Sequence, residues 1–568
     1  MSEFYQDGPV LGNQYQADKL LRSYLNRVLP ADIFTELEPD LLNLGNRVVT
    51  DIMEMAEDAE SNEPQLISFD PWGKRIDKIK TSKGWKDLDQ VSAEEGMVAI
   101  GYERKYGEYS RIYQFVKLYL FHPSSAVYTC PLAMTDGAAR LLEIYGDESL
   151  KNNAYKHLTS RVPGEFWTSG QWMTERTGGS DVGRTETIAR FEDGGYKLYG
   201  TKWFTSATTS QMAITLARIE DEQGNTIPGS RGLSLFYLEV YTQKGQLNSI
   251  TIHRLKNKLG TKALPTAELT LNGTNARLIG DIGGGVKKIS SLFNITRIYN
   301  AKSSIGLMRR AIALAKDYSL RREAFGKKLA EHPLHLETLA NLEVEFQGAF
   351  QSVFYTSELL GKEECGKATA DEIAVLRMLT PLIKLYTAKQ AIKVVSEVLE
   401  SFGGAGYVED TGIPKLLRDT QVLSIWEGTT NILSLDTLRS IEKENTFAPF
   451  IKNILNRLEN ISEQELLISR DKVYQSVQKI KEYFIQAVKE GKTYIETGAR
   501  SFAFSLIRTF TASLMLEHAQ WSLNNENDRS FTISAIRWCN QDLTPLIYPL
   551  DKHGPESKAL ALDEILKK

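Results

Sequence analysis

The sequence is poor in cysteine and contains no long hydrophobic run. Only three cysteines occur in 568 residues, and Cys130, Cys365 and Cys539 lie far apart along the chain. They offer neither a disulfide framework nor a paired CxxC metal motif. No stretch of about 20 apolar residues indicates a membrane span, and the first residues lack the basic segment and apolar run of a secretion signal. We expect a cytoplasmic protein with no membrane span.

Histidine is scarce, and positive charge is not in excess. The 68 Lys and Arg are outnumbered by 72 Asp and Glu, which gives a net charge of −4 and argues against nucleic acid as a partner. Seven histidines are present, and the pair in HPLH, His332 and His335, has no other metal-ligating residues at a suitable spacing. The sequence therefore predicts no metal site.

What the chain does contain is a change of periodicity, from helical to strand-like and back. Residues 17–58 and 93–160 show apolar residues at three- and four-residue intervals, with interruptions predicted at Pro30 and Pro39. Short alternating runs rich in Tyr, Phe, Thr and Ile follow between residues 165 and 278, as in an antiparallel sheet. Long amphipathic segments then predict helices at 289–320, 335–358 and 370–400.

These changes of pattern predict four parts: a helical domain, a β domain, a helical bundle and a helical extension. The predicted limits are, in order, residues 1–168, 169–284, 285–444 and 445–568. The extension contains 16 Lys and Arg and 15 Asp and Glu, so it is not a polybasic tail. We expect it to pack on the core or on a neighbouring subunit.

Two segments have the composition of a cofactor site. WMTERTGGSDVG brings Thr174, Ser180 and flexible glycines together at the start of the β region, where backbone amides and hydroxyls can bind a polar cofactor. GTKWFTS places aromatic rings beside hydroxyls, and such a ring can stack on a flat heterocycle. A plain β turn and ordinary strand packing are the respective alternatives.

Five motifs together resemble the acyl-CoA dehydrogenase family, in its order and approximate spacing. They are MTERTGGSDV, GTKWFTS, LRREAFGK, SFGGAGY and IWEGTTNI. The segments ISFDPWGKRIDKI and SIWEG, together with the C-terminal extension, resemble the AidB-like branch of that family, known from the alkylation response. The resemblance implies an α+β fold, with a helical N-terminal domain, a central antiparallel β domain, a C-terminal four-helix bundle and the helical extension.

The resemblance also implies FAD as the cofactor and assigns residues to it. Met173 and Thr174 would lie at the flavin ring, and Arg322 would meet the pyrophosphate of a neighbouring subunit's FAD. The other implied FAD contacts are Gly179, Ser180, Trp203, Phe204, Thr205, Ser206, Phe325, Gly403, Gly404, Thr429 and Asn431. Three positions depart from the common pattern: Ser206 replaces an asparagine, and Pro333 and Glu400 replace glutamines.

Glu427 matches the catalytic base of the family. It would remove the α-proton of an acyl-CoA thioester while a hydride leaves the β-carbon for the flavin. Substrate and Trp426 would exclude water, which disfavours the charged carboxylate and strengthens it as a base. The backbone N–H at Glu427 and a ribityl hydroxyl of FAD would stabilise the enolate oxygen. Ser180, Arg297, Trp426 and Gly428 would line the substrate site, and Thr296 occupies the position where some relatives carry the base.

The implied function is an FAD-dependent acyl-CoA dehydrogenase of fatty acid metabolism that forms a trans-2-enoyl-CoA. Its electrons would pass to an electron-transfer flavoprotein, and because each site is completed across an interface, the resemblance implies a homo-oligomer, with a tetramer favoured over a dimer. Two alternatives stay open. The protein could bind and sequester acyl-CoA or fatty acid with little turnover, or it could be a DNA-associated protein of the alkylation response.

Overall fold

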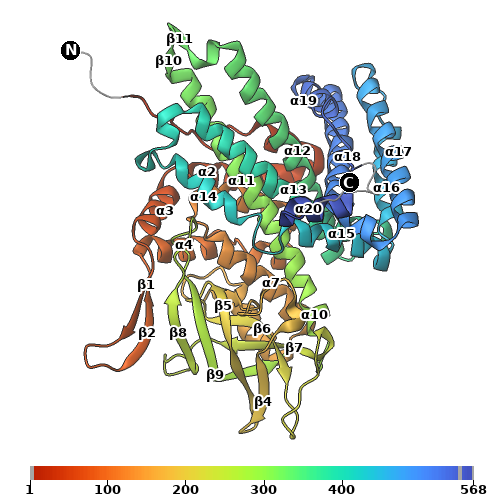
Figure 1. Cartoon of the computed structure of the whole chain (residues 1–568). Helices are drawn as coiled ribbons and strands as arrows, with labels where there is room; N and C mark the ends of the chain where they lie inside the picture. The colour runs from red at the N-terminus through yellow and green to blue at the C-terminus, as the bar shows by residue number, and fades with distance from the viewer. Residues whose placement is uncertain (1–5, 548–552, 566–568) are drawn as a thin grey trace, which may run out of the picture. The chain divides into compact units, whose positions relative to one another are not determined.

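The computed structural model describes residues 6–547 and 553–565 (Figure 1). The chain divides into two compact units. The first, here called the β unit, comprises residues 12–15 and 39–299, and the second, the helical unit, comprises residues 1–11, 16–38 and 300–568. The predicted alternation of helical, β and helical regions is confirmed, as is the fold class.

Long helices build the helical unit, where the amphipathic segments predicted them. The elements are α1 (Lys19–Val28), α11 (Ser290–Arg321, which begins in the β unit), α12 (Pro333–Glu364), α13 (Ala370–Ser401), α14 (Ile413–Val422), α15 (Thr430–Glu444), α16 (Phe447–Glu459), α17 (Leu467–Glu490), α18 (Lys492–Glu526), α19 (Ser530–Cys539) and α20 (His553–Leu562). Thr369 and Glu372 form a capping box at the start of α13. Across the described chain, no helix combines the length and apolar character needed to cross a bilayer.

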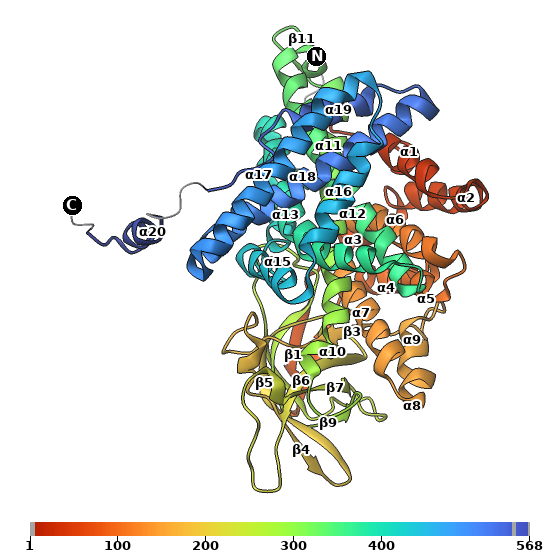
Figure 2. The same ribbon diagram turned by 90° about the vertical axis from the view of Figure 1, so that its right-hand side faces the viewer.

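The C-terminal extension packs on the bundle of its own chain. Its central helix α18 contacts α12, α13 and α15 on one side and α16, α17 and α19 within the extension (Figure 2). Trp538 of α19 is fully buried, and an added methyl group on Gly348 of α12 would lie 2.6 Å from its ring. The prediction that this region packs on the core is therefore confirmed, and a glycine permits the close approach.

Gly348→Ala is expected to lower the stability of the helical unit by about 1–3 kcal/mol, because the new methyl group overlaps a rigid, buried indole. The overlap outweighs the better helix propensity of alanine. Thermal unfolding followed by circular dichroism measures the effect. Gly195→Ala is the control, since a methyl group there meets no atom within 4 Å. Equal melting temperatures for the two variants would contradict the predicted overlap.

The N-terminal region is largely helical as predicted, but the interruption predicted at Pro39 is wrong. Its helices are α2 (Ala31–Arg47), α3 (Asp51–Ser61), α4 (Lys83–Glu94), α5 (Ala99–Glu103), α6 (Ser110–Phe121), α7 (Thr129–Tyr145), α8 (Glu148–Leu150) and α9 (Lys156–Leu158). Pro30 separates α1 from α2, but Pro39 lies inside α2. A proline removes one backbone hydrogen bond, and burial of Leu37, Leu41 and Leu44 on the same helix compensates for that loss.

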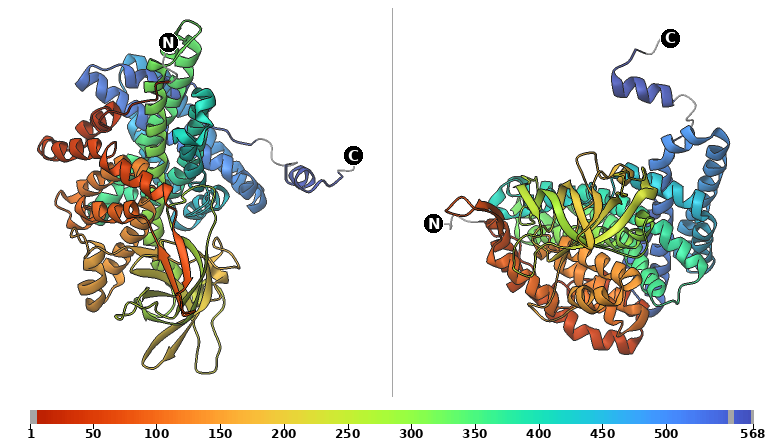
Figure 3. Two further views of the ribbon diagram at one scale, coloured as in Figure 1. Left: turned by 90° about the vertical axis from the view of Figure 1, so that its left-hand side faces the viewer. Right: turned by 90° about the horizontal axis from the view of Figure 1, so that it is seen from below.

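The helical prediction for this region missed a β-hairpin. Strands β1 (Gln65–Phe69) and β2 (Arg75–Lys80) pair antiparallel beside the β domain (Figure 3, left). Leu66 and Ile79 pack against the core of that domain. Two side chains of β2 also bond the backbone of Ile252: the Asp77 carboxylate accepts from its N–H at 3.0 Å, and Arg75 donates to its carbonyl at 2.9 Å.

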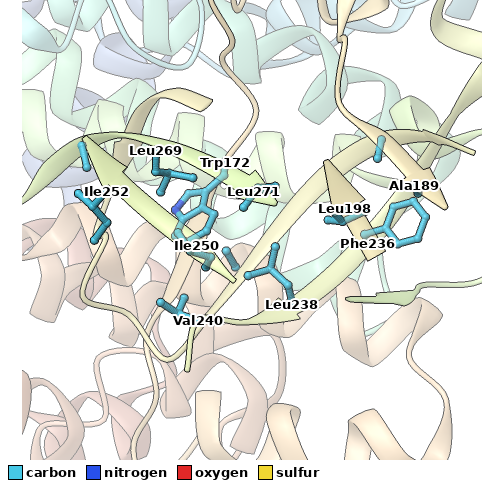
Figure 4. Packing of buried hydrophobic residues seen from close by; sticks show 13 residues of the cluster. Trp172, Ala189, Leu198, Phe236, Leu238, Val240, Ile250, Ile252, Leu269 and Leu271 are labelled. Carbon is cyan, nitrogen blue, oxygen red and sulfur yellow. The ribbon is translucent and has the colours of Figure 1, made fainter. Parts of the chain in front are cut away.

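Seven strands form the β domain, in a mostly antiparallel sheet. They are β3 (Ser169–Gln171), β4 (Ile188–Glu192), β5 (Gly195–Ser206), β6 (Met212–Ile219), β7 (Leu233–Glu239), β8 (Ile250–Leu255) and β9 (Thr266–Leu278). The pairings β6–β4–β5–β9–β7–β6 close a ring, and β6 runs parallel to β3 and β4. Trp172, Phe236 and Leu269 belong to the buried core inside it (Figure 4). The candidate cofactor residues follow β3 and lie at the C-terminal end of β5.

Candidate functional site

The residues predicted for the site fall into two groups, one in each unit. The β unit holds Met173, Thr174, Gly179, Ser180, Trp203, Phe204, Thr205, Ser206 and Arg297, and the helical unit holds Arg322, Phe325, Gly403, Gly404, Trp426, Glu427, Gly428, Thr429 and Asn431. Each group has its own geometry.

In the β unit, Thr174 joins the two predicted cofactor segments. Its carbonyl accepts a hydrogen bond of 2.9 Å from the Trp203 N–H. Gly179 lies against its side chain, because a methyl group on that glycine would be 2.6 Å from the Thr174 hydroxyl oxygen. Met173 is buried, whereas Ser180 is exposed. The fold therefore brings Thr174, Gly179 and Trp203 together, and glycine is the residue that allows the approach.

A buried ion pair, which the sequence did not reveal, connects the same two segments. Lys202 Nζ donates to Glu175 at 2.7 Å, and both side chains are almost fully buried. Glu175 also accepts from the Thr187 hydroxyl at 2.5 Å and the Glu186 N–H at 2.6 Å. Burial raises the pKa of Glu175, but Lys202 and these hydrogen bonds outweigh it and hold the pKa below its ordinary value.

A β-bulge sets the direction of Trp203 and Phe204. The pairing of β5 with β9 shifts between Lys202 and Thr205, so both aromatic residues lie opposite Glu268. Lys256 Nζ lies 3.8 Å from the centroid of the Trp203 ring and 4.5 Å from that of Phe204. Lys256 is also ion-paired with Glu268. The two rings therefore share one cation, and Phe204 is 52% exposed.

Glu268→Gln removes the ion pair with Lys256 and is expected to lower the stability of the fold in a pH-dependent way. Hydrogen bonds from Arg254, followed by the contribution of Lys256, lower the pKa of Glu268 to about 2. A lowered pKa stabilises the fold above the unfolded-state pKa of about 4.3, and the gain is lost as the pH falls toward about 2. The melting temperature of the variant should be lower than that of the wild type at pH 7, with the difference shrinking below about pH 4.3. Thermal unfolding from pH 7 down to the most acid condition that keeps the protein folded checks this, and a constant difference would contradict it.

The remaining predicted strand residues have other partners. Thr205 is fully buried, and its hydroxyl donates to the Ala267 carbonyl at 2.8 Å. The Ser206 hydroxyl lies 3.2 Å from that of Thr266. Thr205 therefore uses its hydroxyl to join β5 to β9, while Trp203 and Phe204 present the rings.

In the helical unit, a short hairpin after α11 carries Phe325 at its tip. Strands β10 (Glu323–Ala324) and β11 (Lys327–Lys328) are joined by Phe325 and Gly326, with φ of 53° and 76°. Positive φ at both positions is the geometry of a type I′ turn. Phe325 is 97% exposed, which is unusual for so large an apolar ring. Arg322 is also exposed and accepts the Leu329 N–H at its carbonyl.

The glycines of SFGGAGY follow directly after α13. Gly403 has φ of 60°, and no atom lies within 4 Å of a methyl group added to Gly403 or Gly404. Their backbone is therefore accessible to a ligand. Pro333 begins α12, where a missing N–H is tolerated, and Glu400 lies near the end of α13.

Glu427 lies in a strained turn between α14 and α15. Its φ is 56°, and that of Gly428 is 102°. Trp426 before it packs against Leu307, Ala388 and Leu423. Thr429 occupies the N-cap position of α15 and is exposed, as is Asn431 in the first turn. A non-glycine residue in the left-handed region persists only where its surroundings hold it, and such residues cluster at functional sites.

The alternative base position on α11 is inert. Thr296 is buried, and its hydroxyl donates to the Phe293 carbonyl at 3.1 Å within the same helix. Arg297 follows it and is half-buried. A threonine hydroxyl cannot act as a base near neutral pH.

These features fit a flavin dinucleotide. Trp203 and Phe204 offer rings for a flat heterocycle, and Thr174 offers a hydroxyl beside a glycine. The exposed Arg322 and Phe325 can meet a pyrophosphate and an aromatic base, respectively. FAD, when bound, supplies the hydride acceptor that amino acid side chains lack.

Comparison with known families matches almost the whole chain in four consecutive segments. They are the Adaptive response protein AidB N-terminal domain (residues 10–162), the Acyl-CoA dehydrogenase middle domain (170–274), the Acyl-CoA dehydrogenase C-terminal domain (283–441) and the Acyl-CoA dehydrogenase 11 C-terminal domain-like family (445–566).

Individual relatives agree with these matches. Acyl-CoA dehydrogenase family member 11 of Caenorhabditis elegans is 45% identical, over 96% of this chain and 90% of that protein. The putative acyl-CoA dehydrogenase AidB of Escherichia coli is 30% identical, over 71% of this chain and 74% of that protein. The crystal structure of C. elegans ACDH-11 in complex with C11-CoA superimposes with a TM-score of 0.96 at 42% identity, covering 100% of this chain and 98% of that one. The chain therefore belongs to the acyl-CoA dehydrogenase family, whose members are FAD-dependent oxidoreductases acting on acyl-CoA, and to the branch that carries AidB-type N-terminal and ACDH-11-type C-terminal domains.

Proposed function

We propose that this protein dehydrogenates an acyl-CoA at the Cα–Cβ bond, with Glu427 as the base. The observation that carries the proposal is the turn at Glu427, whose left-handed backbone is held between Trp426 and the start of α15. The Glu427 carboxylate would take the α-proton, and FAD, when bound, would supply the acceptor for the β-hydride, so that the product would be a trans-2-enoyl-CoA.

The other residues of the two groups hold substrate and cofactor. In this proposal Met173, Thr174 and Trp203 line the flavin, and Arg297 and Gly428 line the substrate. Arg322 and Phe325 serve the FAD of a neighbouring subunit, so the active form is a homo-oligomer, and we favour a tetramer. A cytoplasmic location and an electron-transfer flavoprotein as acceptor complete the proposal. The three domain limits, at residues 168, 284 and 444, remain predictions.

The C11-CoA complex of the ACDH-11 structure supports an acyl-CoA of about that chain length as the substrate. It equally supports the alternative in which the protein binds acyl-CoA with little turnover, because a complex shows binding alone. We favour dehydrogenation because the base and the flavin-facing segments are both present. Duplex DNA binding is a third alternative, and a gel shift at low and high salt tests it.

Anaerobic titration of the FAD-loaded protein with acyl-CoAs tests the function. Straight chains from four to sixteen carbons and branched chains are added in turn, and the oxidised-flavin band at about 450 nm is followed. Bleaching establishes a dehydrogenase, and its dependence on chain length identifies the substrate. Spectral shifts without bleaching would establish the binding protein instead. A protein that cannot be loaded with FAD would overturn the cofactor assignment.

A further inference from the structure

A buried lysine is bonded to the turn that carries Glu427. Lys384 lies in the middle of α13, is 0% exposed, and donates from Nζ to the Gly428 carbonyl at 2.5 Å. Gly428 directly follows Glu427, and the lysine is 44 residues away from it in sequence. Burying an ammonium is unfavourable unless it is hydrogen-bonded, so the contact with the Gly428 carbonyl helps to make the buried position of Lys384 possible.

The turn needs such a restraint because its backbone is not self-supporting. Glu427 and Gly428 have φ of 56° and 102°, and the left-handed region is unfavourable for a residue that carries a side chain. A methyl group on Gly428 would lie 2.9 Å from the Leu433 side chain, so the position admits only glycine. Glycine, in turn, has more backbone freedom than any other residue. A hydrogen bond to the Gly428 carbonyl therefore restricts a residue whose backbone has many other conformations open to it.

The contacts described on either side of the turn come from other groups. Trp426 packs on Leu307 and Ala388 before the turn, and the Leu433 N–H bonds the Thr429 carbonyl after it. The Gly428 carbonyl lies between these two fixed points. A charged donor makes a stronger hydrogen bond than a neutral one, and Lys384 itself is buried.

We propose that Lys384 is a positioning residue for the base: by holding the Gly428 carbonyl, it fixes the direction in which the Glu427 carboxylate points. The inference rests on the proposed role of Glu427. A misplacement of about 1 Å can slow a reaction by about 100-fold. Loss of the lysine should therefore reduce the rate of the chemical step far more than it reduces acyl-CoA or FAD binding.

The test compares Lys384→Met, Lys384→Arg and Lys302→Met as FAD-loaded proteins. Methionine fills similar space without a donor, and arginine keeps a charged donor. Lys302 is the matched control, because it is a second buried lysine of the helical unit, 1% exposed, and its Nζ lies 2.8 Å from the Phe354 ring centroid rather than at the turn. FAD content, C11-CoA affinity and the anaerobic rate of flavin reduction at saturating C11-CoA are measured for each.

We expect Lys384→Met to reduce its flavin about 10- to 100-fold more slowly than the wild type, with FAD content and affinity changed less than twofold. Lys384→Arg should recover part of the rate, and Lys302→Met should keep the wild-type rate. Wild-type reduction by Lys384→Met would overturn the proposal. Loss of FAD or of the fold in both Lys384 variants would overturn it in favour of a structural role.

Hydrogen exchange separates this proposal from the proposed function. Peptides covering residues 423–433 should exchange faster in Lys384→Met than in the wild type and Lys302→Met, whether or not any acyl-CoA bleaches the flavin. Failure of the wild type to bleach would overturn the dehydrogenase while leaving this result to decide the role of Lys384. Unchanged exchange across 423–433 would show that the turn does not depend on the lysine.

Discussion

Glu427→Gln is expected to slow anaerobic flavin reduction by acyl-CoA by about 10²- to 10⁴-fold, the usual contribution of a general base. Glutamine keeps the size and hydrogen-bonding shape of the side chain but cannot accept the α-proton. The strained backbone of Glu427 should survive the change, because the hydrogen bond from Lys384 to the Gly428 carbonyl does not involve the Glu427 side chain. Stopped-flow absorbance at about 450 nm measures the rate, and difference spectra show that acyl-CoA still binds.

A matched control is available on the helix that follows the turn. Glu442→Gln removes a carboxylate from the exposed face of α15, where it pairs with Lys443, and should leave reduction unchanged. A wild-type rate in Glu427→Gln would assign the base to another residue. A slow rate in both variants would indicate a general effect of charge on the helical unit.

Glu175→Gln is expected to destabilise the β unit by about 3–5 kcal/mol, the range found when one member of a buried ion pair is removed. The neutral amide leaves the ammonium of Lys202 fully buried without its counter-charge. Because the pair joins the Thr174 and Trp203 segments, the FAD content of the purified protein should fall as well. Urea unfolding followed by circular dichroism, and the flavin-to-protein absorbance ratio, measure the two effects.

The double variant Glu175→Gln/Lys202→Met makes this prediction specific. Removing both charges should recover much of the lost stability, since a buried pair can be replaced by apolar groups with little loss. Glu220→Gln serves as the control in the same domain, because its pair with Arg190 is partly exposed and should contribute little. Additive losses in the double variant would argue that the two residues act independently.

The fold followed from the sequence where periodicity was long and regular. The segments 335–358 and 370–400 became α12 and α13, and the alternating runs became the strands of the β domain. The hairpin at 65–80 was missed because it is short, lies between helical segments and alternates over only a few residues. Its turn, DPWGK, is a signal that could have revealed it. The interruption predicted at Pro39 was wrong because the burial of leucines on the same helix compensates for the missing backbone hydrogen bond.

The site was predictable as a set of motifs and not as a geometry. The sequence singled out Thr174, Trp203 and Glu427, and the fold joins the first two by one backbone hydrogen bond. The sequence could not show that the Thr205 side chain turns inward, because its direction depends on a bulge in β5. Nor could it pair Lys202 with Glu175, or Lys384 with Gly428, since such contacts depend on how distant elements register in space.

The hairpin of β1 and β2 has a bearing on how the sheet avoids edge-to-edge pairing with other molecules. A strand at the margin of a sheet presents unpaired backbone groups, which can recruit a strand from another molecule. On β8, the Ile252 N–H and carbonyl are bonded by Asp77 and Arg75, which imitate a neighbouring strand with side chains that no further strand can extend. The hairpin thus blocks the edge of β8. If the hairpin detached, this edge would be exposed and could pair with a strand of another molecule.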